Sequence, residues 1–330
     1  MSQVVSVRIH SSQFPEMVRN DLLQSLRTRR INHKFHYDSI KQTQKWLALH
    51  QAYSPSRTDA DCAVTYEKSF VAAAKRIRSQ NIHLIGLGCG GGQKDARFLS
   101  LLKKQGRELF YTPSDVSVAM VLVAKETAGA VIPDAKCFPF VCDLASDEKL
   151  SEMFQEKIPS RAIRLFTFFG MIPNFEPEKI LPRLSTLMRR KDLLLFSANL
   201  APGANYSAGM KKILPLYDND LTRDWLQTFL TDIGVEKRDG DLKFTIEEIP
   251  CWRLKVKRVA AHFHFSRRRV IELSGEQFEF TNGEKIRLFF SYRHQPQGIS
   301  QLLKEQGMDV LDQWITNSEE EGVLLCQKSR

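Results

Sequence analysis

Ile82-His-Leu-Ile-Gly-Leu-Gly-Cys-Gly-Gly-Gly-Gln-Lys-Asp95 is the stretch that decides the fold of this chain. An apolar run typical of a buried strand passes directly into a cluster of glycines. At a strand-to-helix turn, glycines allow positive φ and let a ligand approach where a Cβ would collide. The stretch therefore predicts a nucleotide-binding turn at the end of a strand.

Short apolar runs alternate with helix-length segments from this turn onward. The runs cover residues 82–87, 109–112, 136–141, 164–169 and 193–198. This alternation predicts a parallel sheet with crossover helices, in an α/β fold of the Rossmann-like kind. Residues 1–80 are expected to be helical.

Later in the chain the apolar pattern changes to a period of two, which indicates antiparallel strands. Strands of this kind are expected at residues 254–265, 269–273, 277–280 and 286–292, with a turn at Asn282-Gly283. A helix near residues 299–306 is followed by runs at 308–316 and 323–327. These last two runs predict a terminal antiparallel hairpin.

Composition limits the class of protein. The chain has 330 residues with 42% apolar content, which is enough for the cores of two medium domains. No apolar run approaches the ~20 residues of a membrane span, and the first residues show no signal-peptide pattern. We therefore expect a cytoplasmic protein, with a monomer as the favoured state. The six cysteines include no Cys-x-x-Cys pair, so no metal site is expected.

The formal net charge of +10 raises the question of an acidic partner. Arginines cluster at Arg27, Arg29, Arg30 and residues 267–269. Because positive charges are spread through the chain and mixed with acids, a solvated surface is favoured over nucleic-acid binding.

Three ligands compete for the glycine turn. A P-loop is excluded because Gln93 precedes Lys94 and no magnesium-binding hydroxyl follows. A dinucleotide fits the weak Gly-x-Gly-x-x-Gly pattern of Gly86, Gly88 and Gly91. S-adenosylmethionine, the third ligand, needs an acid after the second strand for its ribose and another after the third for its adenine.

Asp115 and Asp143 stand at those two strand ends. Each could instead cap the helix that follows it, as could Ser117. Two acids on successive strand ends of one sheet favour the adenosine interpretation, because ligands of open α/β sheets gather at the carboxyl ends of strands. The predicted terminal hairpin is typical of methyltransferase sheets and favours S-adenosylmethionine further.

Several segments together resemble the family of histidine-specific S-adenosylmethionine-dependent methyltransferases, of the ergothioneine type. The similar segments, from about Phe35 onward, are Phe35-His-Tyr-Asp38, Tyr53-Ser-Pro-Ser-Arg57, the glycine turn with Lys94, Tyr111-Thr-Pro-Ser-Asp-Val-Ser117, Gly170-Met-Ile-Pro-Asn-Phe-Glu-Pro177 and Leu216-Tyr-Asp218. The resemblance implies a substrate-binding domain from residues 1–60 and 202–292. A cofactor-binding methyltransferase domain would comprise residues 61–201 and 293–330.

The resemblance also implies roles for individual residues. The cofactor, with S-adenosylhomocysteine as its product, would be held by Gly86, Gly88, Gly90, Lys94, Asp115, Ser117, Asp143 and Gly170. Asn174, helped by Tyr217, would hold the amino-acid head group of the substrate, and Tyr37 and Tyr53 would close the amine side. Asn174 and Tyr37 are the predicted catalytic residues. Each tyrosine could equally be a packing residue, and Asn174 a turn residue.

One position departs from the family pattern. The family's Glu-x-Ser, which holds the imidazole of histidine, corresponds here to Phe289-Phe290-Ser291. A pocket that loses a buried acceptor and gains a phenyl ring no longer favours an imidazole N–H. The predicted acceptor is therefore the amino group of an amino acid or related small molecule other than histidine, with Phe289 and Ser291 as substrate-binding residues.

Two other functions remain open from the sequence. The missing carboxylate and Pro173 are compatible with a pseudoenzyme or regulatory protein that binds the cofactor without methyl transfer. The arginine clusters are compatible with a nucleic-acid methyltransferase. Ile172-Pro173-Asn174-Phe175 does not match the Asn/Asp-Pro-Pro-Tyr/Phe motif of base methylation, which lowers that alternative.

Overall fold

The computed structural model describes residues 4–37, 39–54, 59–146, 154, 158 and 162–329. The chain forms two compact units. Unit 1 comprises Met1–Gln13, Ala60–Leu200 and His294–Arg330, and unit 2 comprises Phe14–Asp59 and Ala201–Arg293. Residues 1–13, which the sequence assigned to the substrate-binding domain, belong instead to unit 1, the unit that carries the glycine turn. The substrate role predicted for the other unit stays a prediction.

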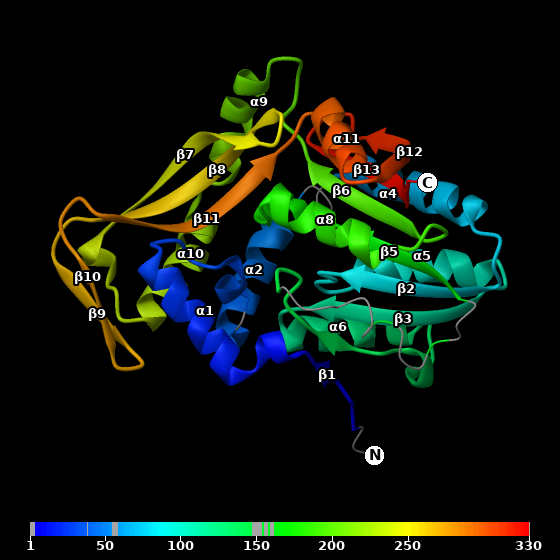
Figure 1. Cartoon of the computed structure of the whole chain (residues 1–330), viewed down its shortest axis with the longest axis horizontal. Helices are drawn as coiled ribbons and strands as arrows, with labels where there is room; N and C mark the ends of the chain where they lie inside the picture. Colours follow the sequence, from blue (N-terminus) through cyan, green and yellow to red (C-terminus); the bar gives the residue numbers. More distant parts are fainter. Residues whose placement is uncertain are drawn as a thin grey trace. The chain divides into compact units, whose positions relative to one another are not determined.

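Unit 1 is built around one large sheet (Figure 1). Its strands are β1 (Arg8–Ile9), β2 (Asn81–Leu87), β3 (Glu108–Asp115), β4 (Phe140–Val141), β5 (Ile163–Phe168), β6 (Leu193–Asn199), β12 (Met308–Ile315) and β13 (Glu321–Lys328). The strand order is β1-β4-β3-β2-β5-β6-β13-β12. Strands β1 to β6 pair in parallel, whereas β13 runs antiparallel to both β6 and β12. The predicted α/β class and the terminal antiparallel hairpin are confirmed.

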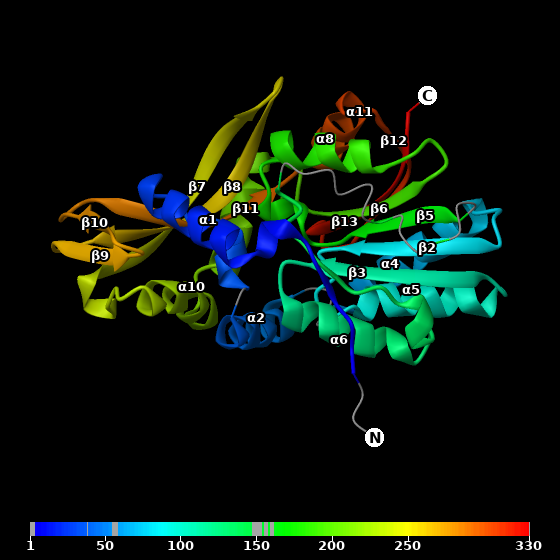
Figure 2. The same ribbon diagram turned by 60° about the horizontal axis from the view of Figure 1, so that its bottom comes forward.

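Helices cover both faces of this sheet. They are α4 (Ala60–Arg76), α5 (Gln93–Lys104), α6 (Val118–Gly129), α8 (Pro177–Leu187) and α11 (Pro296–Glu305), with short 3-10 turns η1 (Ser11–Gln13), η3 (Asp134–Lys136) and η4 (Ile172–Asn174). Figure 2 shows α4, α5 and α6 on one face and α8 and α11 on the other. The central strands are apolar along their length because both of their faces are buried. Phe70 of α4 and Phe98 of α5 stack at 4.7 Å in the core between helices and sheet.

Strand β4 is much shorter than the predicted run at residues 136–141. Pro139 has no backbone N–H to extend the ladder, and Asp134–Lys136 forms a 3-10 turn instead. The carbonyl of Pro139 accepts a hydrogen bond from the N–H of Arg8 at 3.1 Å, and the two-residue strand β1 pairs with β4 from there. The prediction that residues 1–80 are helical is wrong at β1. This strand has only two residues and is too short to show the alternation of apolar and polar residues that marks a strand.

Unit 2 combines helices with antiparallel strands. Its elements are α1 (Pro15–Arg27), η2 (His33–His36), α2 (Ile40–Tyr53), α9 (Tyr206–Ile213), η5 (Leu214–Leu216), α10 (Asp220–Asp232), η6 (Lys237–Asp239), β7 (Gly240–Cys251), β8 (Leu254–Phe265), β9 (Arg269–Leu273), β10 (Glu276–Phe280) and β11 (Lys285–Arg293). Three strands form a sheet in the order β11-β8-β7, and β9 and β10 form a separate hairpin. The predicted strands are present.

The pairing in unit 2 differs from a simple succession of hairpins. Strand β11 pairs with β8, so the Asn282-Gly283 turn does not join two paired neighbours. Strand β7 was missed because few of its side chains are buried and it carries Glu247, Glu248 and Pro250. Its partner β8 is almost wholly buried and packs with Trp225 and Phe229 of α10 in one core. None of the helices in the described ranges is long and apolar enough to cross a membrane.

Candidate active site

The glycine turn lies between β2 and α5, at the carboxyl end of β2. Gly88 and Gly90 have φ values of 66° and 50°, where residues with a Cβ are strained. A Cβ on Gly88 would also lie 2.3 Å from Sδ of Met171. The turn is therefore packed against the loop that follows β5, and Met171 is a neighbour of the glycines that the sequence did not indicate.

A side chain at position 86 would collide with another residue of the protein itself. A Cβ on Gly86 would lie 2.2 Å from Oδ2 of Asp95, which is buried in the first turn of α5. The Asp95 carboxylate accepts hydrogen bonds from the hydroxyls of Tyr111 on β3 at 2.8 Å and Thr167 on β5 at 2.7 Å. Burial raises the pKa of Asp95 to about 6, although these two donors oppose the shift. The cofactor contact of Gly86 stays a prediction.

Asp115 joins two of the predicted cofactor residues. Its Oδ2 accepts a hydrogen bond from the N–H of Gly90 at 3.2 Å, and its Oδ1 accepts one from the N–H of Ser117 at 3.1 Å. Burial raises the pKa of Asp115, and the backbone donors oppose that rise. The Ser117 hydroxyl is the N-cap of α6 and accepts from the N–H of Met120 at 3.4 Å. The carboxylate thus ties the glycine turn to the start of α6.

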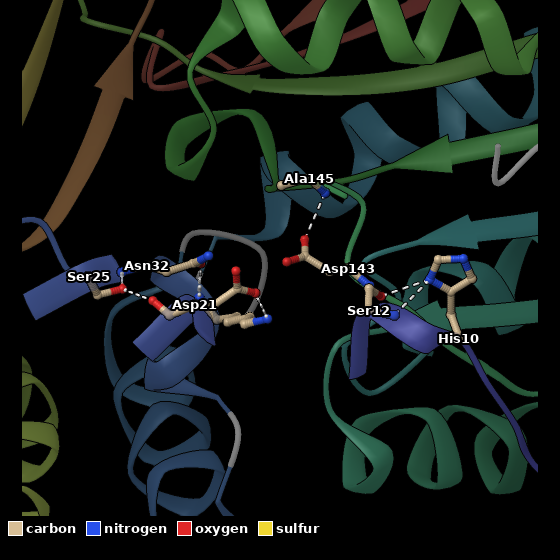
Figure 3. Close-up of polar contacts among 8 residues, drawn as sticks. His10, Ser12, Asp21, Ser25, Asn32, Asp143 and Ala145 are labelled. Carbon is tan, nitrogen blue, oxygen red and sulfur yellow. Dashed lines mark hydrogen bonds and ion pairs between the residues drawn. The ribbon is translucent and has the colours of Figure 1, made fainter. Parts of the chain in front are cut away.

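Asp143 follows β4 and is held from the amino-terminal segment (Figure 3). Its Oδ1 accepts from the N–H of Ala145 at 2.7 Å, and its own N–H donates to Ser12 Oγ at 3.1 Å. The Ser12 hydroxyl lies 2.9 Å from Nδ1 of His10. Ser12 and His10 were missed because the sequence assigned residues 1–60 to the other domain. The pairing of β1 with β4 brings them to this edge of the sheet.

Lys94 lies in the first turn of α5, beside residues that the sequence analysis did not select. Its Nζ is 3.9 Å from the centre of the Tyr66 ring and 3.8 Å from Oε1 of Glu321. Tyr66 belongs to α4, and Glu321 is the first residue of β13. Tyr66 and Glu321 therefore contact the ammonium. The lysine side chain is 27% exposed, so part of it remains open to solvent.

The loop after β5 carries Gly170 and Asn174. Gly170 has a φ of 68°, and its N–H donates to the Ser197 hydroxyl at the end of β6 at 2.8 Å. Asn174 ends the 3-10 turn η4 and is half-buried, and its N–H donates to the carbonyl of Met171 at 3.0 Å. This loop therefore stands at the same carboxyl edge as the glycine turn.

The residues predicted to bind substrate lie in unit 2, where Tyr217, Phe289 and Ser291 form one cluster. The hydroxyls of Tyr217 and Ser291 are 2.8 Å apart, and Nε of Arg293 donates to the Tyr217 hydroxyl at 2.9 Å. The Phe289 ring lies 6.2 Å from the Tyr217 ring and is only 7% exposed. Arg293, which fixes the Tyr217 hydroxyl, was not predicted.

Tyr37 belongs to the same group of rings. Its hydroxyl lies 2.8 Å from Nε2 of His33, and its ring lies 5.6 Å from that of Trp225. The imidazole of His33 lies 5.5 Å from the Phe289 ring. We call Tyr37, Tyr217, Phe289, Trp225 and His33 the aromatic cluster. His33 is a neighbour of the predicted catalytic tyrosine that sequence reasoning missed.

Tyr53 stands apart from the aromatic cluster. It is the last residue of α2, and its side chain is 46% exposed. Residues 55–57 and Asp38, which contributed to the family resemblance, lie outside the described residues. The predicted contact of Tyr53 with substrate stays a prediction.

Comparison with known protein families decides the identity. The model of the family described as histidine-specific methyltransferase, SAM-dependent, matches residues 18–328. The chain belongs to this family. It is therefore an S-adenosylmethionine-dependent methyltransferase by family, and S-adenosylmethionine is its cofactor. No curated protein matches the chain.

Solved structures similar to this methyltransferase are distant in sequence. Magnesium protoporphyrin IX methyltransferase from Synechocystis, with bound SAH, is 13% identical over 89% of this chain and 97% of its own, with a TM-score of 0.44. The 1,6-didemethyltoxoflavin-N1-methyltransferase of Burkholderia thailandensis is 11% identical over 87% and 91%, with a TM-score of 0.39. The mitomycin 7-O-methyltransferase MmcR is 15% identical over 96% and 69%, with a TM-score of 0.43.

The chemistry of the carboxyl edge suits the cofactor of this methyltransferase. S-adenosylmethionine carries a carboxylate, two ribose hydroxyls and an adenine amine, which need one cationic donor and several acceptors. Lys94 supplies an ammonium, and Asp115 and Asp143 supply carboxylates whose orientation is fixed by backbone N–H groups. Gly88 and Gly90 of the turn are half-buried, so part of their backbone remains open to a ligand. The donor set therefore fits the cofactor.

The arginine clusters of this methyltransferase are largely engaged in ion pairs. Arg27 pairs with Glu276 at 2.5 Å, Arg29 with Glu284 at 3.5 Å and Arg268 with Glu279 at 2.6 Å, while Arg267 pairs with the buried Asp239. Arginines that are neutralised within the chain have less charge to offer to phosphates. The clusters that raised the nucleic-acid alternative therefore serve contacts inside unit 2.

Proposed function

We propose that this methyltransferase methylates the amino group of an amino acid or related small molecule other than histidine. The observation that carries the proposal is Phe289, a nearly buried ring in contact with His33, Tyr217 and Trp225. It stands where the family pattern has the carboxylate that holds an imidazole.

The cofactor is assigned to the carboxyl edge of the large sheet. Lys94, Gly88 and Gly90 would hold its methionine part, Asp115 and Ser117 its ribose, and Asp143 its adenine. Asp115 suits the ribose because backbone N–H groups, among them those of Gly90 and Ser117, orient its carboxylate, whose two oxygens offer several lone pairs for hydroxyls. When bound, S-adenosylmethionine supplies a methyl group on a sulfonium, which is open to attack by a neutral amine.

The protein has to orient the amine and remove its proton. Asn174 would bind the head group of the substrate, since it stands after β5 beside Met171 and the glycine turn. Tyr37 would accept the proton of the amine, and His33, whose Nε2 is 2.8 Å from the Tyr37 hydroxyl, would take up the tyrosine's own proton. Alignment of the reacting atoms accounts for most of the rate in such a transfer.

Specificity would come from the aromatic cluster. An imidazole N–H placed against Phe289 loses a hydrogen bond, which costs about 1–3 kcal/mol in a buried site. An apolar or aromatic side chain loses nothing there and gains ring contacts. Ser291 would contribute little to an imidazole, because its hydroxyl already pairs with that of Tyr217.

The proposal is tested with isotope-labelled S-adenosylmethionine and a panel of amino acids and small amines, with products identified by mass spectrometry. We expect a methylated amine from at least one apolar or aromatic amino acid, and slower transfer to histidine. The control is Tyr37→Phe, which keeps the ring, removes the proton acceptor and should reduce turnover of the same acceptor. Methylation of histidine as the best acceptor would contradict the proposal. Cofactor binding with no acceptor methylated would instead favour the pseudoenzyme.

A further inference from the structure

A buried polar group lies beside the glycine turn and has no assigned role. Glu321 begins β13 and stands opposite Asn199, the last residue of β6, so it lies at the carboxyl edge of the sheet. Its side chain is 9% exposed. A buried carboxylate needs donors and a nearby cation to remain charged, so its partners show what it does.

Three side chains converge on this carboxylate. The Tyr66 hydroxyl donates to Oε1, the Cys62 thiol donates to Oε2 at 3.3 Å, and Lys94 Nζ lies 3.8 Å from Oε1. Burial raises the pKa of Tyr66, and the charge of Glu321 raises it further, so the tyrosine keeps its proton and remains a donor. Glu321 and Tyr66 therefore form one hydrogen-bonded pair.

The same pair fixes the ammonium of Lys94. The Tyr66 ring presents its face to Lys94 Nζ at 3.9 Å, and the Phe169 ring lies 5.7 Å away. The two rings meet edge to face with their centres 5.1 Å apart, so each ring restricts the movement of the other beside the ammonium. A free lysine side chain loses rotamer entropy when a ligand orders it, and a lysine that is already held loses less.

We propose that Glu321, together with Tyr66, is a positioning residue that holds Lys94 ready for the carboxylate of the methionine part of the cofactor. This rests on the proposed role of Lys94. Glu321 touches neither cofactor nor substrate and acts only through the lysine. Its 3.8 Å separation from the ammonium leaves donor hydrogens of Lys94 for a second carboxylate.

The experiment compares two ligands by isothermal titration calorimetry. S-adenosylhomocysteine carries the amino-acid carboxylate, whereas 5′-methylthioadenosine has the same adenosine and thioether without it. In Glu321→Gln we expect affinity for S-adenosylhomocysteine to fall about 10-fold and affinity for 5′-methylthioadenosine to stay within 2-fold. Tyr66→Phe, which keeps the ring but removes the hydroxyl, should give a smaller loss of the same kind. Glu305→Gln, at an exposed position of α11, is the matched control and should change neither affinity.

The outcomes separate this inference from the cofactor assignment. Equal losses for both ligands in Glu321→Gln would show a purely structural role, and an unchanged or higher affinity for S-adenosylhomocysteine would show that Glu321 only neutralises the lysine. Either result overturns the inference. Lys94→Met must also lower the affinity for S-adenosylhomocysteine and leave that for 5′-methylthioadenosine unchanged. If it does not, both the proposed role of Lys94 and this inference are overturned. If the wild-type protein bound neither ligand, the cofactor assignment itself would fail. Should Glu321→Gln not fold, Tyr66→Phe decides by the same comparison.

Discussion

The carboxyl edge of the large sheet and the aromatic cluster of unit 2 are built on different chemistry. At the edge, Asp115 and Asp143 are held by backbone N–H groups. In the cluster, the Tyr37 hydroxyl meets His33 four residues away, the Tyr217 hydroxyl meets Ser291 and Arg293 from a strand distant in sequence, and the Phe289 ring packs against other rings.

This difference teaches how each region can vary. A carboxylate held by backbone donors keeps its position as long as the strand ends remain, so the edge is tied to the fold. A cluster held by side-chain contacts can be changed by a single substitution, and we propose that Phe289 is such a change relative to the family pattern. The following experiments test this contrast, from the largest expected effect to the smallest.

Asp115→Ala should have the largest effect, because it removes the proposed ribose acceptor and leaves the N–H groups of Gly90 and Ser117 without their partner. We expect affinity for S-adenosylhomocysteine to fall about 1000-fold, which is about 4 kcal/mol, as measured by calorimetry. Asp134→Ala removes an ion pair with Lys125 and should bind normally. A loss below about 10-fold would mean that the edge does not depend on its acids.

Asp95 should make stability depend on pH. Its folded pKa of about 6 lies above the ordinary 3.8, so the folded protein binds the proton more tightly than the unfolded chain does. Stability is therefore highest below pH 3.8 for this group and falls as pH rises to about 6. The fall is about 3 kcal/mol at most, from about two pKa units at 1.36 kcal/mol each.

Urea unfolding between pH 4 and pH 6, followed by circular dichroism, measures this dependence. Asp95→Asn cannot ionise and should flatten the curve in that window, whereas Asp134→Asn should leave it unchanged. If Asp95→Asn kept the wild-type slope, the buried carboxylate would not be its source.

Gly86→Ala should destabilise unit 1 by about 2 kcal/mol, because the new Cβ would overlap the Asp95 carboxylate. Gly129→Ala is the matched control, since its Cβ position meets no described atom within 4 Å beyond its neighbours in the chain and the backbone of its own helix. Thermal unfolding compares the two. In an Asp95→Ala background the cost of Gly86→Ala should largely disappear, and a cost that persists would point to another obstacle.

Tyr217→Phe should have the smallest effect, about 1 kcal/mol of stability, because it removes hydrogen bonds to Ser291 and Arg293 but keeps the ring. Tyr53→Phe, at an exposed tyrosine, should change less than about 0.5 kcal/mol. A double-mutant cycle with Ser291→Ala measures the hydroxyl pair directly. Additive losses would show that the aromatic cluster does not depend on this pair.

Much of the fold could be predicted from local pattern. The five parallel runs from residue 82 onward and the terminal hairpin follow from apolar periodicity and from the glycine turn. The two-residue strand β1 and the polar strand β7 could not be predicted, because neither carries a period. Residues 1–13, which the sequence assigned to the substrate-binding domain, join unit 1 because β1 pairs with β4.

The candidate site likewise contains residues that could be selected from the sequence and residues that could not. Asp115 and Asp143 could be selected because they end strands of one sheet. Ser12, Tyr66 and Glu321 could not, since they come from other parts of the chain. Ser12 and Glu321 reach the edge through strand pairing, and Tyr66 reaches it through the packing of α4 on the sheet. Glu321 was not selected from the sequence, although its place at the start of β13 puts it beside the end of β6.

The sequence by itself determined the α/β class, the glycine turn and the acids at the strand ends, because each of these is set by neighbours a few residues away. The resemblance to the family also implies, from the sequence alone, that Phe289 stands where the family pattern has a carboxylate. The tertiary structure alone decided that Asp95 accounts for Gly86, that Ser12 supports Asp143 and that His33 meets Tyr37. Ser12 and Asp143 are joined across a long stretch of chain by the pairing of β1 with β4. Gly86 and Asp95, like His33 and Tyr37, are close in sequence, but their contacts depend on how the strands and helices pack, and no local pattern records such contacts.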